Sequence, residues 1–239
     1  MTVRAQDQQA AQAVQHLAAH APEQQVRLIA GPGTGKSSTI EERVSWLIEQ
    51  GVEPTRIAVI SFTNASVVDL RLRLHAYCRG RNQAGINEVS ISTLHSLALR
   101  LLRRAHLLDF YPTRPLVLDD WELENVYDEE FGFAQGIASK PRREEIRRYY
   151  EALWSTGRAN AATYVPPEPP ITDDERQRFT LFHQPTSQVY SCVLPGEIVR
   201  KCADAAAAGV IDIPELLGIQ HLIVDEYQDF NMVDLQFVD

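Results

Sequence analysis

The stretch AGPGTGKSS, residues 30–38, lies where an apolar run rich in β-branched residues gives way to a helical pattern. Gly33 and Gly35 allow backbone conformations that a side chain disfavours, so consecutive N–H groups can converge on a phosphate at a helix N-terminus. Lys36 would then reach the β- and γ-phosphates of a nucleotide, and the Ser37 hydroxyl would bind Mg²⁺. The strict pattern has glycine at position 30, where this chain has alanine. The stretch predicts a phosphate-binding loop, with a chance glycine-rich turn as the alternative.

Short apolar runs alternate with helical patterns on both sides of this loop. The four candidate strands are residues 26–30, 56–61, 88–92 and 221–225. The first three are each followed by apolar residues at helical spacing, which would pack on a sheet. This order of strand and helix is typical of an α/β fold with a parallel sheet flanked by helices.

A long segment between the third and fourth candidate strands breaks this rhythm. It includes the turn-forming run VPPEPPITDDE at residues 165–175. We expect residues 105–219 to form a mainly helical subdomain inserted into the sheet domain. Residues 1–104 would be the first part of that domain, and residues 220–239 would add its last strand and a following helix.

Two adjacent carboxylates follow the fourth candidate strand, in the sequence HLIVDE at residues 221–226. A carboxylate at the end of a buried strand can hold Mg²⁺ through water, and a second can orient and deprotonate an attacking water. Asp225 and Glu226 are the candidates for these two roles. An acidic pair at a strand end is a weak signal alone, but hydrolysis of a nucleotide needs both the phosphate loop and the base.

Composition sets limits on the class of protein. The formal net charge is −9, which taken alone disfavours nucleic-acid binding, but the arginines gather in short clusters. Three widely spaced cysteines without a CxxC pair argue against a disulfide framework and a structural zinc site. The start of the chain lacks a signal-peptide pattern and no run is long enough to span a bilayer, so we expect a cytoplasmic protein without a membrane partner.

Four segments, in order, resemble the UvrD/Rep/PcrA family of superfamily 1 DNA helicases. They are AGPGTGKS at residues 30–37, ISFTNASVVDL at 60–70, STLHSLALRLLRR at 92–104 and VDEYQDFN at 224–231. The DEYQD sequence separates this family from DEAD-box helicases and from generic P-loop kinases. The resemblance covers residues 7–104 and residues 220 onwards, and it implies a P-loop NTPase domain of RecA-like fold that uses ATP and Mg²⁺.

The resemblance implies a set of nucleotide contacts. They are Gly31, Pro32, Gly33, Thr34, Gly35, Lys36, Ser37, Ser38 and Arg43. Asp225 would hold the metal together with Ser37, Glu226 would be the general base, and Gln228 would sense the γ-phosphate. A solvated helix face is the alternative for Arg43. The family also reads adenine with a glutamine near the N-terminus, for which Gln8 is slightly favoured over Gln9.

The same resemblance implies contacts with single-stranded DNA. The residues are Phe62, Thr63, Asn64, Thr93 and His95. An aromatic ring offers a stacking platform, and short hydroxyls and amides bond to phosphate without demanding a base sequence. The alternatives are that Phe62 belongs to the core and that Thr93 and His95 cap the helix that follows them.

A further arginine cluster lies in the expected insertion, at residues 142–148. The family's insertion leans on the duplex ahead of a fork, so contact with duplex DNA is one reading of the cluster. The other is a salt-bridged helix face, because Glu144 lies three and four residues before Arg147 and Arg148. The neighbouring aromatics Tyr149, Tyr150 and Trp154 favour packing over stacking on bases.

The chain ends soon after the acidic pair, so we expect it to lack the second RecA-like domain of a complete motor. That domain supplies arginines to the γ-phosphate, so the isolated chain, expected to be a monomer, would hydrolyse ATP slowly and not unwind DNA. The complete protein would move 3′ to 5′ on single-stranded DNA. A helicase subunit of a RecB/Adn-type helicase-nuclease and a catalytically idle nucleotide- or DNA-binding module are the two alternatives.

Overall fold

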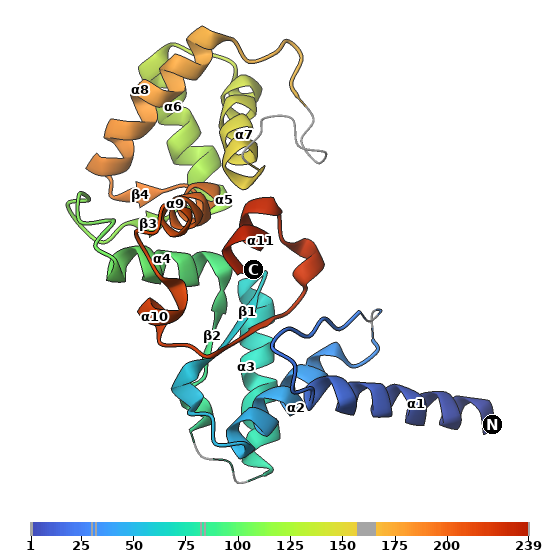
Figure 1. Cartoon of the computed structure of the whole chain (residues 1–239). Coiled ribbons are helices and arrows are strands. Elements are labelled where there is room, and N and C mark those ends of the chain that lie inside the picture. Colours follow the sequence, from blue (N-terminus) through green and yellow to red (C-terminus); the bar gives the residue numbers. More distant parts are fainter. Residues whose placement is uncertain are drawn as a thin grey trace. The chain divides into compact units, whose positions relative to one another are not determined.

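The computed structural model describes residues 2–29, 31, 33–81, 83, 85–156 and 166–238, with the backbone alone for residues 2–9 and 156. The chain divides into two compact units (Figure 1). The first contains residues 1–93 and 217–229, and the second contains residues 94–216 and 230–239. The expected boundaries lie at residues 104 and 220. The helices at residues 94–104 and 232–238, both expected in the sheet domain, belong instead to the second unit.

A three-stranded parallel sheet forms the centre of the first unit. Its order is β2 (Ser90–Thr93), β1 (Ile57–Ser61) and β5 (His221–Val224). Val59 of β1 lies opposite Ile91 on one side and Ile223 on the other, and every residue of β1 is buried. Because all three strands run the same way, their carboxyl ends meet at one edge of the sheet.

Helices α2 (Lys36–Glu49) and α3 (Asn64–Arg79) supply the apolar residues that pack with this sheet. Val44 and Leu47 of α2 and Leu70 and Leu74 of α3 form one buried cluster with β1 and β2. The unit also contains α1 (Thr2–Ala19) and three 3₁₀ turns at Pro54–Arg56, Ile86–Glu88 and Tyr227–Asp229. The expected pattern of parallel strands and helices is confirmed for the second, third and fourth candidate strands.

The first candidate strand is not formed. Residues 25–29 have no regular structure, and Ala30 lies outside the described residues. Ile29 is 85% exposed and Val26 is 47% exposed. A strand exists through its ladder of hydrogen bonds, and within the described part of the chain β5 pairs only with β1. The prediction of a strand at residues 26–30 was therefore wrong. An apolar run in the sequence does not show whether a neighbouring strand is in place to form hydrogen bonds with it.

The second unit is mainly helical with one small parallel pair of strands. Its elements are α4 (Leu94–Arg104), β3 (Leu116–Val117), α5 (Asp120–Glu122), a π-helical turn (Leu123–Tyr127), α6 (Asp128–Gln135), α7 (Lys140–Thr156), α8 (Asp173–Val189), β4 (Cys192–Val193), α9 (Pro195–Ala207), α10 (Ile213–Leu217) and α11 (Met232–Val238). Asp119 and Thr172 begin α5 and α8 with capping boxes, which satisfy the free N–H groups of the first turn.

Aromatic rings fill the core of this unit. Phe131, Phe179 and Phe182 are buried together with Tyr127. The ring of Tyr150 stacks on Phe179 with centroids 4.2 Å apart. The expectation that the aromatics of α7 pack rather than stack on bases is confirmed for Tyr150, which is joined to the core by this contact.

The arginine cluster of α7 is ion-paired along its length. Arg142 pairs with Glu175 at 2.7 Å, Arg143 with Glu129 at 2.6 Å, Arg147 with Asp128 at 2.9 Å, and Arg148 with Glu144. The bond from Arg142 lowers the pKa of Glu175 to about 2. The expected pairing of Glu144 with Arg148 is present, whereas Arg147 turns inward to Asp128. The contacts favour the salt-bridged alternative over duplex contact.

The three cysteines are buried free thiols. Burial raises the pKa of Cys192 to about 11 and that of Cys202 to about 12. They therefore serve as small apolar core residues. No described helix is both long and apolar enough to cross a bilayer.

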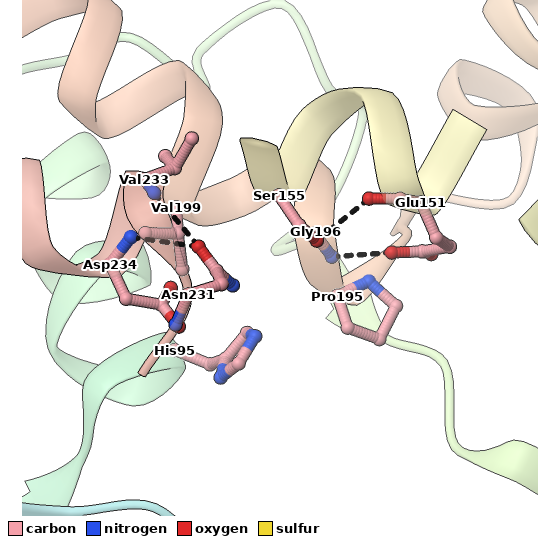
Figure 2. Close-up of a pocket in the computed structure, with 9 residues that line it drawn as sticks. All are labelled: His95, Glu151, Ser155, Pro195, Gly196, Val199, Asn231, Val233 and Asp234. Atoms are coloured by element: carbon pink, nitrogen blue, oxygen red, sulfur yellow. Dashed lines mark hydrogen bonds between the residues drawn. The ribbon is translucent and has the colours of Figure 1, made fainter. Parts of the chain in front are cut away.

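A small cavity in the second unit contains a buried carboxyl group (Figure 2). Glu151 accepts a hydrogen bond from the backbone N–H of Gly196 at 2.9 Å through one oxygen. Its other oxygen is buried without a hydrogen-bond partner among the described residues. Burial raises the pKa of Glu151 to about 7. Ionising this group in the folded chain is therefore costly.

The raised pKa of Glu151 predicts a pH-dependent loss of stability. Between the ordinary glutamate pKa of about 4.5 and pH 7, the unfolded chain releases a proton that the folded chain retains, so the free energy of unfolding falls as pH rises. The loss amounts to roughly 3 kcal/mol and is complete above pH 7. Glu151→Gln cannot ionise and should escape it. Urea unfolding of both proteins from pH 4.5 to 8 measures the difference; parallel curves would contradict the assignment.

Candidate nucleotide site

The phosphate-loop residues have the backbone conformation that the sequence predicted. Gly33 and Gly35 have φ angles of 71° and 87°, in the left-handed region that favours glycine. Helix α2 begins at Lys36 directly after Gly35, with no side-chain cap and no acidic residue in its first turn. The N–H groups of this turn and the helix dipole therefore favour an anion at this point. Pro32 lies outside the described residues.

Lys36 and Glu226 form an ion pair although 190 residues separate them in the sequence. The Lys36 ammonium donates to the Glu226 carboxylate at 2.9 Å. This bond raises the pKa of Lys36 and lowers the pKa of Glu226, so both groups are charged at neutral pH. The site thus unites the lysine of the phosphate loop with the second carboxylate of the DE pair.

Asp225 is held at the end of β5 by the neighbouring strand. Its N–H donates to the carbonyl of Ile60 at 2.8 Å, and the hydroxyl of Ser61 lies 3.4 Å from its carboxylate. Burial, followed by the negative charge of Glu226, raises the pKa of Asp225. Sequence reasoning missed Ser61. Its place at the end of the predicted second strand could have indicated it, since parallel strands end at the same edge.

Glu226 has an unusual backbone conformation. Its φ angle is 52°, which a residue with a side chain rarely adopts and which costs free energy. The Gln228 amide donates to the same Glu226 oxygen that Lys36 contacts. Glu226 is therefore held from two sides, by a cation and by an amide. Gln228 lies beside the candidate base, in the 3₁₀ turn Tyr227–Asp229.

The remaining nucleotide candidates have different surroundings. Lys36, Ser37 and Ser38 are the first three residues of α2, and Ser37 is half-buried. Thr34 folds back on the loop, where its hydroxyl donates to the carbonyl of Gly31 at 2.6 Å. The side chains of Gln8 and Gln9 lie outside the described residues, so the choice between them stays a prediction.

Arg43 contacts α1. Its guanidinium donates to the carbonyls of Ala19 at 3.1 Å and Ala21 at 2.6 Å and lies over the ring of Trp46. Burial lowers the pKa of Arg43. Arg43 therefore does not lie on a solvated helix face. Its described hydrogen-bond partners are the carbonyl of Ala19, the last residue of α1, and that of Ala21 just beyond it. Its proposed role at the nucleotide stays a prediction.

Gln15 is a loop contact that the sequence did not indicate. Its amide donates to the carbonyl of Thr34 at 2.5 Å. A Cβ atom placed on Gly35 would lie 2.5 Å from the same amide nitrogen, whereas one placed on Gly33 would meet nothing within 4 Å. Gly35 thus provides both a left-handed turn and room for the side chain of Gln15.

Four of the five candidate DNA residues belong to the carboxyl edge of the sheet. Phe62 is 44% exposed, so the core alternative for it is wrong. Thr63 accepts from the N–H of Ser66 at 3.1 Å and caps α3, and Asn64 is exposed beside it. Thr93 is buried and lies opposite Ser61 in the ladder.

His95 belongs to the second unit. It lines the cavity of Figure 2 together with Glu151 and Asp234. Burial lowers the pKa of His95, so the ring is neutral at pH 7. A neutral ring near two carboxyl groups gives no electrostatic attraction to phosphate, and its role in DNA binding stays a prediction.

Comparison with known proteins gives a consistent group of relatives. The family model described as the UvrD/REP helicase N-terminal domain matches residues 10–180, more than half of the chain. The ATP-dependent DNA helicase SRS2 of Saccharomyces cerevisiae is 28% identical over 89% of this chain and 19% of its own length. DNA helicase II of Haemophilus influenzae is 24% identical over 88% of this chain and 29% of its own length.

A third relative is named as a subunit of a helicase/nuclease. This component of the ATP-dependent helicase/nuclease of Heliobacterium modesticaldum is 30% identical over 54% of this chain and 10% of its own length. The chain therefore spans less than a third of the length of each of these three relatives.

The contact between Gln15 and Gly35 predicts unequal costs for two alanine substitutions. Gly33→Ala should lower the free energy of unfolding by about 1 kcal/mol, because alanine is strained in the left-handed conformation. Gly35→Ala should lower it by about 1 kcal/mol more, because the new methyl group also displaces Gln15 from Thr34. The extra loss should disappear in a Gln15→Ala background, as a double-mutant cycle by urea unfolding would measure. If Gly35→Ala lowered the free energy of unfolding equally with Gln15 present and with Gln15→Ala, Gln15 would not occupy this place.

Proposed function

Because this chain belongs to the UvrD/REP helicase family through its N-terminal domain, we propose that it is the ATP-binding part of a DNA helicase. The observation that carries the proposal is the meeting of Lys36 and Glu226 at 2.9 Å. A phosphate loop and a strand-end DE pair are the two halves of a hydrolytic site, and they are far apart in the sequence. Their contact supports a site built for nucleotide hydrolysis.

The ion pair suggests how a nucleotide would engage the site. The triphosphate would compete with Glu226 for the Lys36 ammonium, and the uncapped first turn of α2 would add N–H donors. Glu226, released from Lys36, would be free to accept a proton from the attacking water. Gln228, already bonded to Glu226, would orient that water or contact the γ-phosphate.

The chain's residues fit a Mg²⁺ ion in chemical type. Ser37 offers a hydroxyl, and Asp225 offers a carboxylate held by Ile60 and Ser61, and Mg²⁺ prefers oxygen ligands. When bound, the ion would neutralise charge on the phosphates. The bound ion would also compensate the negative charge of Asp225, so Asp225 would repel Glu226 less. Both carboxylates would then be ionised more readily.

The activity of the complete protein is a further part of the proposal. SRS2 is named an ATP-dependent DNA helicase and the Haemophilus influenzae relative a DNA helicase. In such a motor, a second RecA-like domain would supply arginines worth about 10³ to 10⁵ in rate. We propose movement 3′ to 5′ on single-stranded DNA in the complete protein, and slow ATP turnover with no unwinding by residues 1–239 alone. A cytoplasmic monomer is the form in which we expect it to act.

The second unit is proposed to be the inserted subdomain of this motor. Its helical content supports that assignment, as does the place of residues 94–216 between β2 and β5 in the sequence. The ion-paired arginines of α7 give little support to contact with duplex DNA at a fork. We keep residues 1–104, 105–219 and 220–239 as the proposed division by function. The structural division differs from it in placing α4 and α11 in the second unit.

A helicase subunit of a helicase-nuclease is the second candidate. The relative from Heliobacterium modesticaldum favours it by name and by 30% identity. The nucleotide and DNA sites would be the same in both cases. Nuclease activity in the full-length protein would decide for this candidate.

Two substitutions should separate nucleotide binding from hydrolysis. Lys36→Ala removes the ammonium group that would contact the phosphates, and it should weaken ATP binding by more than about tenfold. Glu226→Gln should keep binding but lose turnover by at least about a hundredfold, since it removes the general base. A fluorescent ATP analogue measures binding, and phosphate release measures turnover, each with and without single-stranded DNA.

The exposed residues Lys140 and Glu88 provide matched controls. Lys140→Ala and Glu88→Gln make the same chemical changes away from the site and should leave binding and turnover unchanged. ATP binding by Lys36→Ala at wild-type affinity would contradict the proposed site. An idle binding module would instead bind ATP through Lys36 and show no turnover in the full-length protein.

The exposed ring of Phe62 predicts a stacking contact with single-stranded DNA. Base stacking on an aromatic contributes about 1 to 3 kcal/mol, so Phe62→Ala should weaken binding of a labelled oligothymidylate by at least about fivefold. Phe133 is 93% exposed in α6 of the second unit and provides the control. Fluorescence anisotropy of the oligothymidylate with Phe62→Ala and with Phe133→Ala tests the contact. If the two variants bound the oligothymidylate with equal affinity, the stacking contact would be contradicted.

A further inference from the structure

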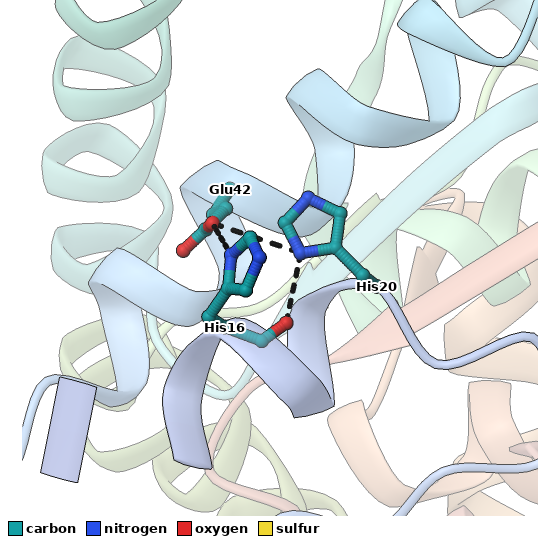
Figure 3. A group of neighbouring side chains, drawn as sticks. All are labelled: His16, His20 and Glu42. Atoms are coloured by element: carbon teal, nitrogen blue, oxygen red, sulfur yellow. Dashed lines mark hydrogen bonds and ion pairs between the residues drawn. The ribbon is translucent and has the colours of Figure 1, made fainter. Parts of the chain in front are cut away.

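Two histidines and a glutamate from different helices converge on one point of the first unit (Figure 3). His16 lies in the last turn of α1, and His20 directly follows the helix, four residues on. The His20 N–H donates to the carbonyl of His16 at 3.1 Å, as in a helical turn, so both side chains lie on the same side. Glu42 faces them from α2. One ligand atom from each of the three side chains lies within 4.8 Å of the other two. We propose that this group is a binding site for a divalent transition-metal ion of the zinc class.

The distances show how little the group must change to bind an ion. The Nδ1 atom of His16 is 2.7 Å from a Glu42 oxygen, and the Nδ1 atom of His20 is 3.7 Å from the same oxygen. Ligands of one tetrahedral zinc lie about 3.3 Å apart, given bonds of about 2.0 to 2.1 Å. The side chain of His16 is 64% exposed. A small rotation of this ring therefore replaces the His16–Glu42 hydrogen bond with two bonds to the metal.

His20 is held beside the group by a backbone contact. Its Nδ1 atom, which lies 3.7 Å from Glu42, also lies 2.8 Å from the carbonyl oxygen of His16, and a carbonyl can only accept. In the metal-free chain this Nδ1 therefore carries the proton. An ion bound at Nδ1 would displace that proton and its hydrogen bond to the carbonyl, as metal binding commonly does at its ligands. The ring of Trp46 meets His20 edge-on and restricts it further.

The donor set selects the kind of ion. Two imidazoles and one carboxylate suit Zn²⁺ and its neighbours among the transition metals, whereas Mg²⁺ and Ca²⁺ prefer oxygen ligands throughout. Three protein ligands leave a fourth position for water, which the exposed side of His16 can admit. The site is therefore distinct in chemistry from the Mg²⁺ position proposed beside Asp225.

A metal here would fasten α1 to the helix that carries Lys36. Residues adjacent to the ligands already join the same elements: Gln15 bonds to Thr34, and Arg43 bonds to Ala19 and Ala21. The ion would add a third connection between them. Binding should therefore stabilise the folded chain, because the three ligands are brought together only in the folded state.

The test is titration of the purified metal-free chain with Zn²⁺ and, separately, with Co²⁺. Calorimetry should give one ion per chain, and Zn²⁺ should raise the thermal unfolding midpoint. His16→Ala and Glu42→Gln should each lower the affinity by more than about tenfold. Glu42→Gln retains a hydrogen-bonding oxygen, and His16 is exposed, so both variants should fold. The Co²⁺ spectrum should lack the thiolate charge-transfer band, because the three cysteines are buried elsewhere.

A second histidine–carboxylate pair provides the matched control. His106 lies 2.9 Å from Asp109 on the surface of the second unit and belongs to no group of three ligands among the described residues. The variant His106→Asn suits the φ angle of 59° at this position and should leave metal binding unchanged. Absent binding, or a loss of affinity as large in His106→Asn as in His16→Ala, would overturn the site. Neither result would bear on ATP binding through Lys36.

Discussion

The Lys36–Glu226 ion pair depends on the parallel sheet and in turn organises the nucleotide site. Lys36 starts α2, and Glu226 follows β5, so the pair can form only if the end of β5 lies beside the phosphate loop. The ladder that joins β1 to β5 sets this position, with Asp225 N–H bonded to Ile60. Both side chains remain partly exposed, so the pair contributes to the site through the position that it gives the two groups rather than through a large gain in stability.

The contacts of α1 extend the influence of the site toward the N-terminus. Gln15, Arg43 and the His16–His20–Glu42 group all connect α1 to the phosphate loop or to α2. Each connection is modest alone, and two of them involve exposed side chains. Together they suggest that α1 positions the loop, so an ion on the histidine group and a nucleotide on Lys36 would affect the same two helices.

The sequence predicted those parts of the fold whose signal is local. Three strands, the helices that follow the candidate strands, and the left-handed glycines of the loop follow from periodicity and from the motif. The strand at residues 26–30 was predicted wrongly, because its apolar pattern says nothing about a ladder partner. Gln15 and Glu151 acquire their roles from residues distant in the sequence, and no local pattern marks them. The same reason hid the pairing of Arg147 with Asp128, since the sequence indicated only Glu144 as a partner. Ser61 could have been indicated by its place at the end of the predicted second strand, opposite Asp225.

A nucleotide that binds this site should take Lys36 from Glu226. A crystal structure of the chain with Mg²⁺ and a non-hydrolysable ATP analogue would test this exchange. We expect the Lys36 ammonium to bond to the β- or γ-phosphate and Asp225 and Ser37 to lie near the metal. Glu226 should be released from Lys36 and face the γ-phosphate. A structure in which the analogue binds elsewhere while Lys36 stays paired with Glu226 would contradict it.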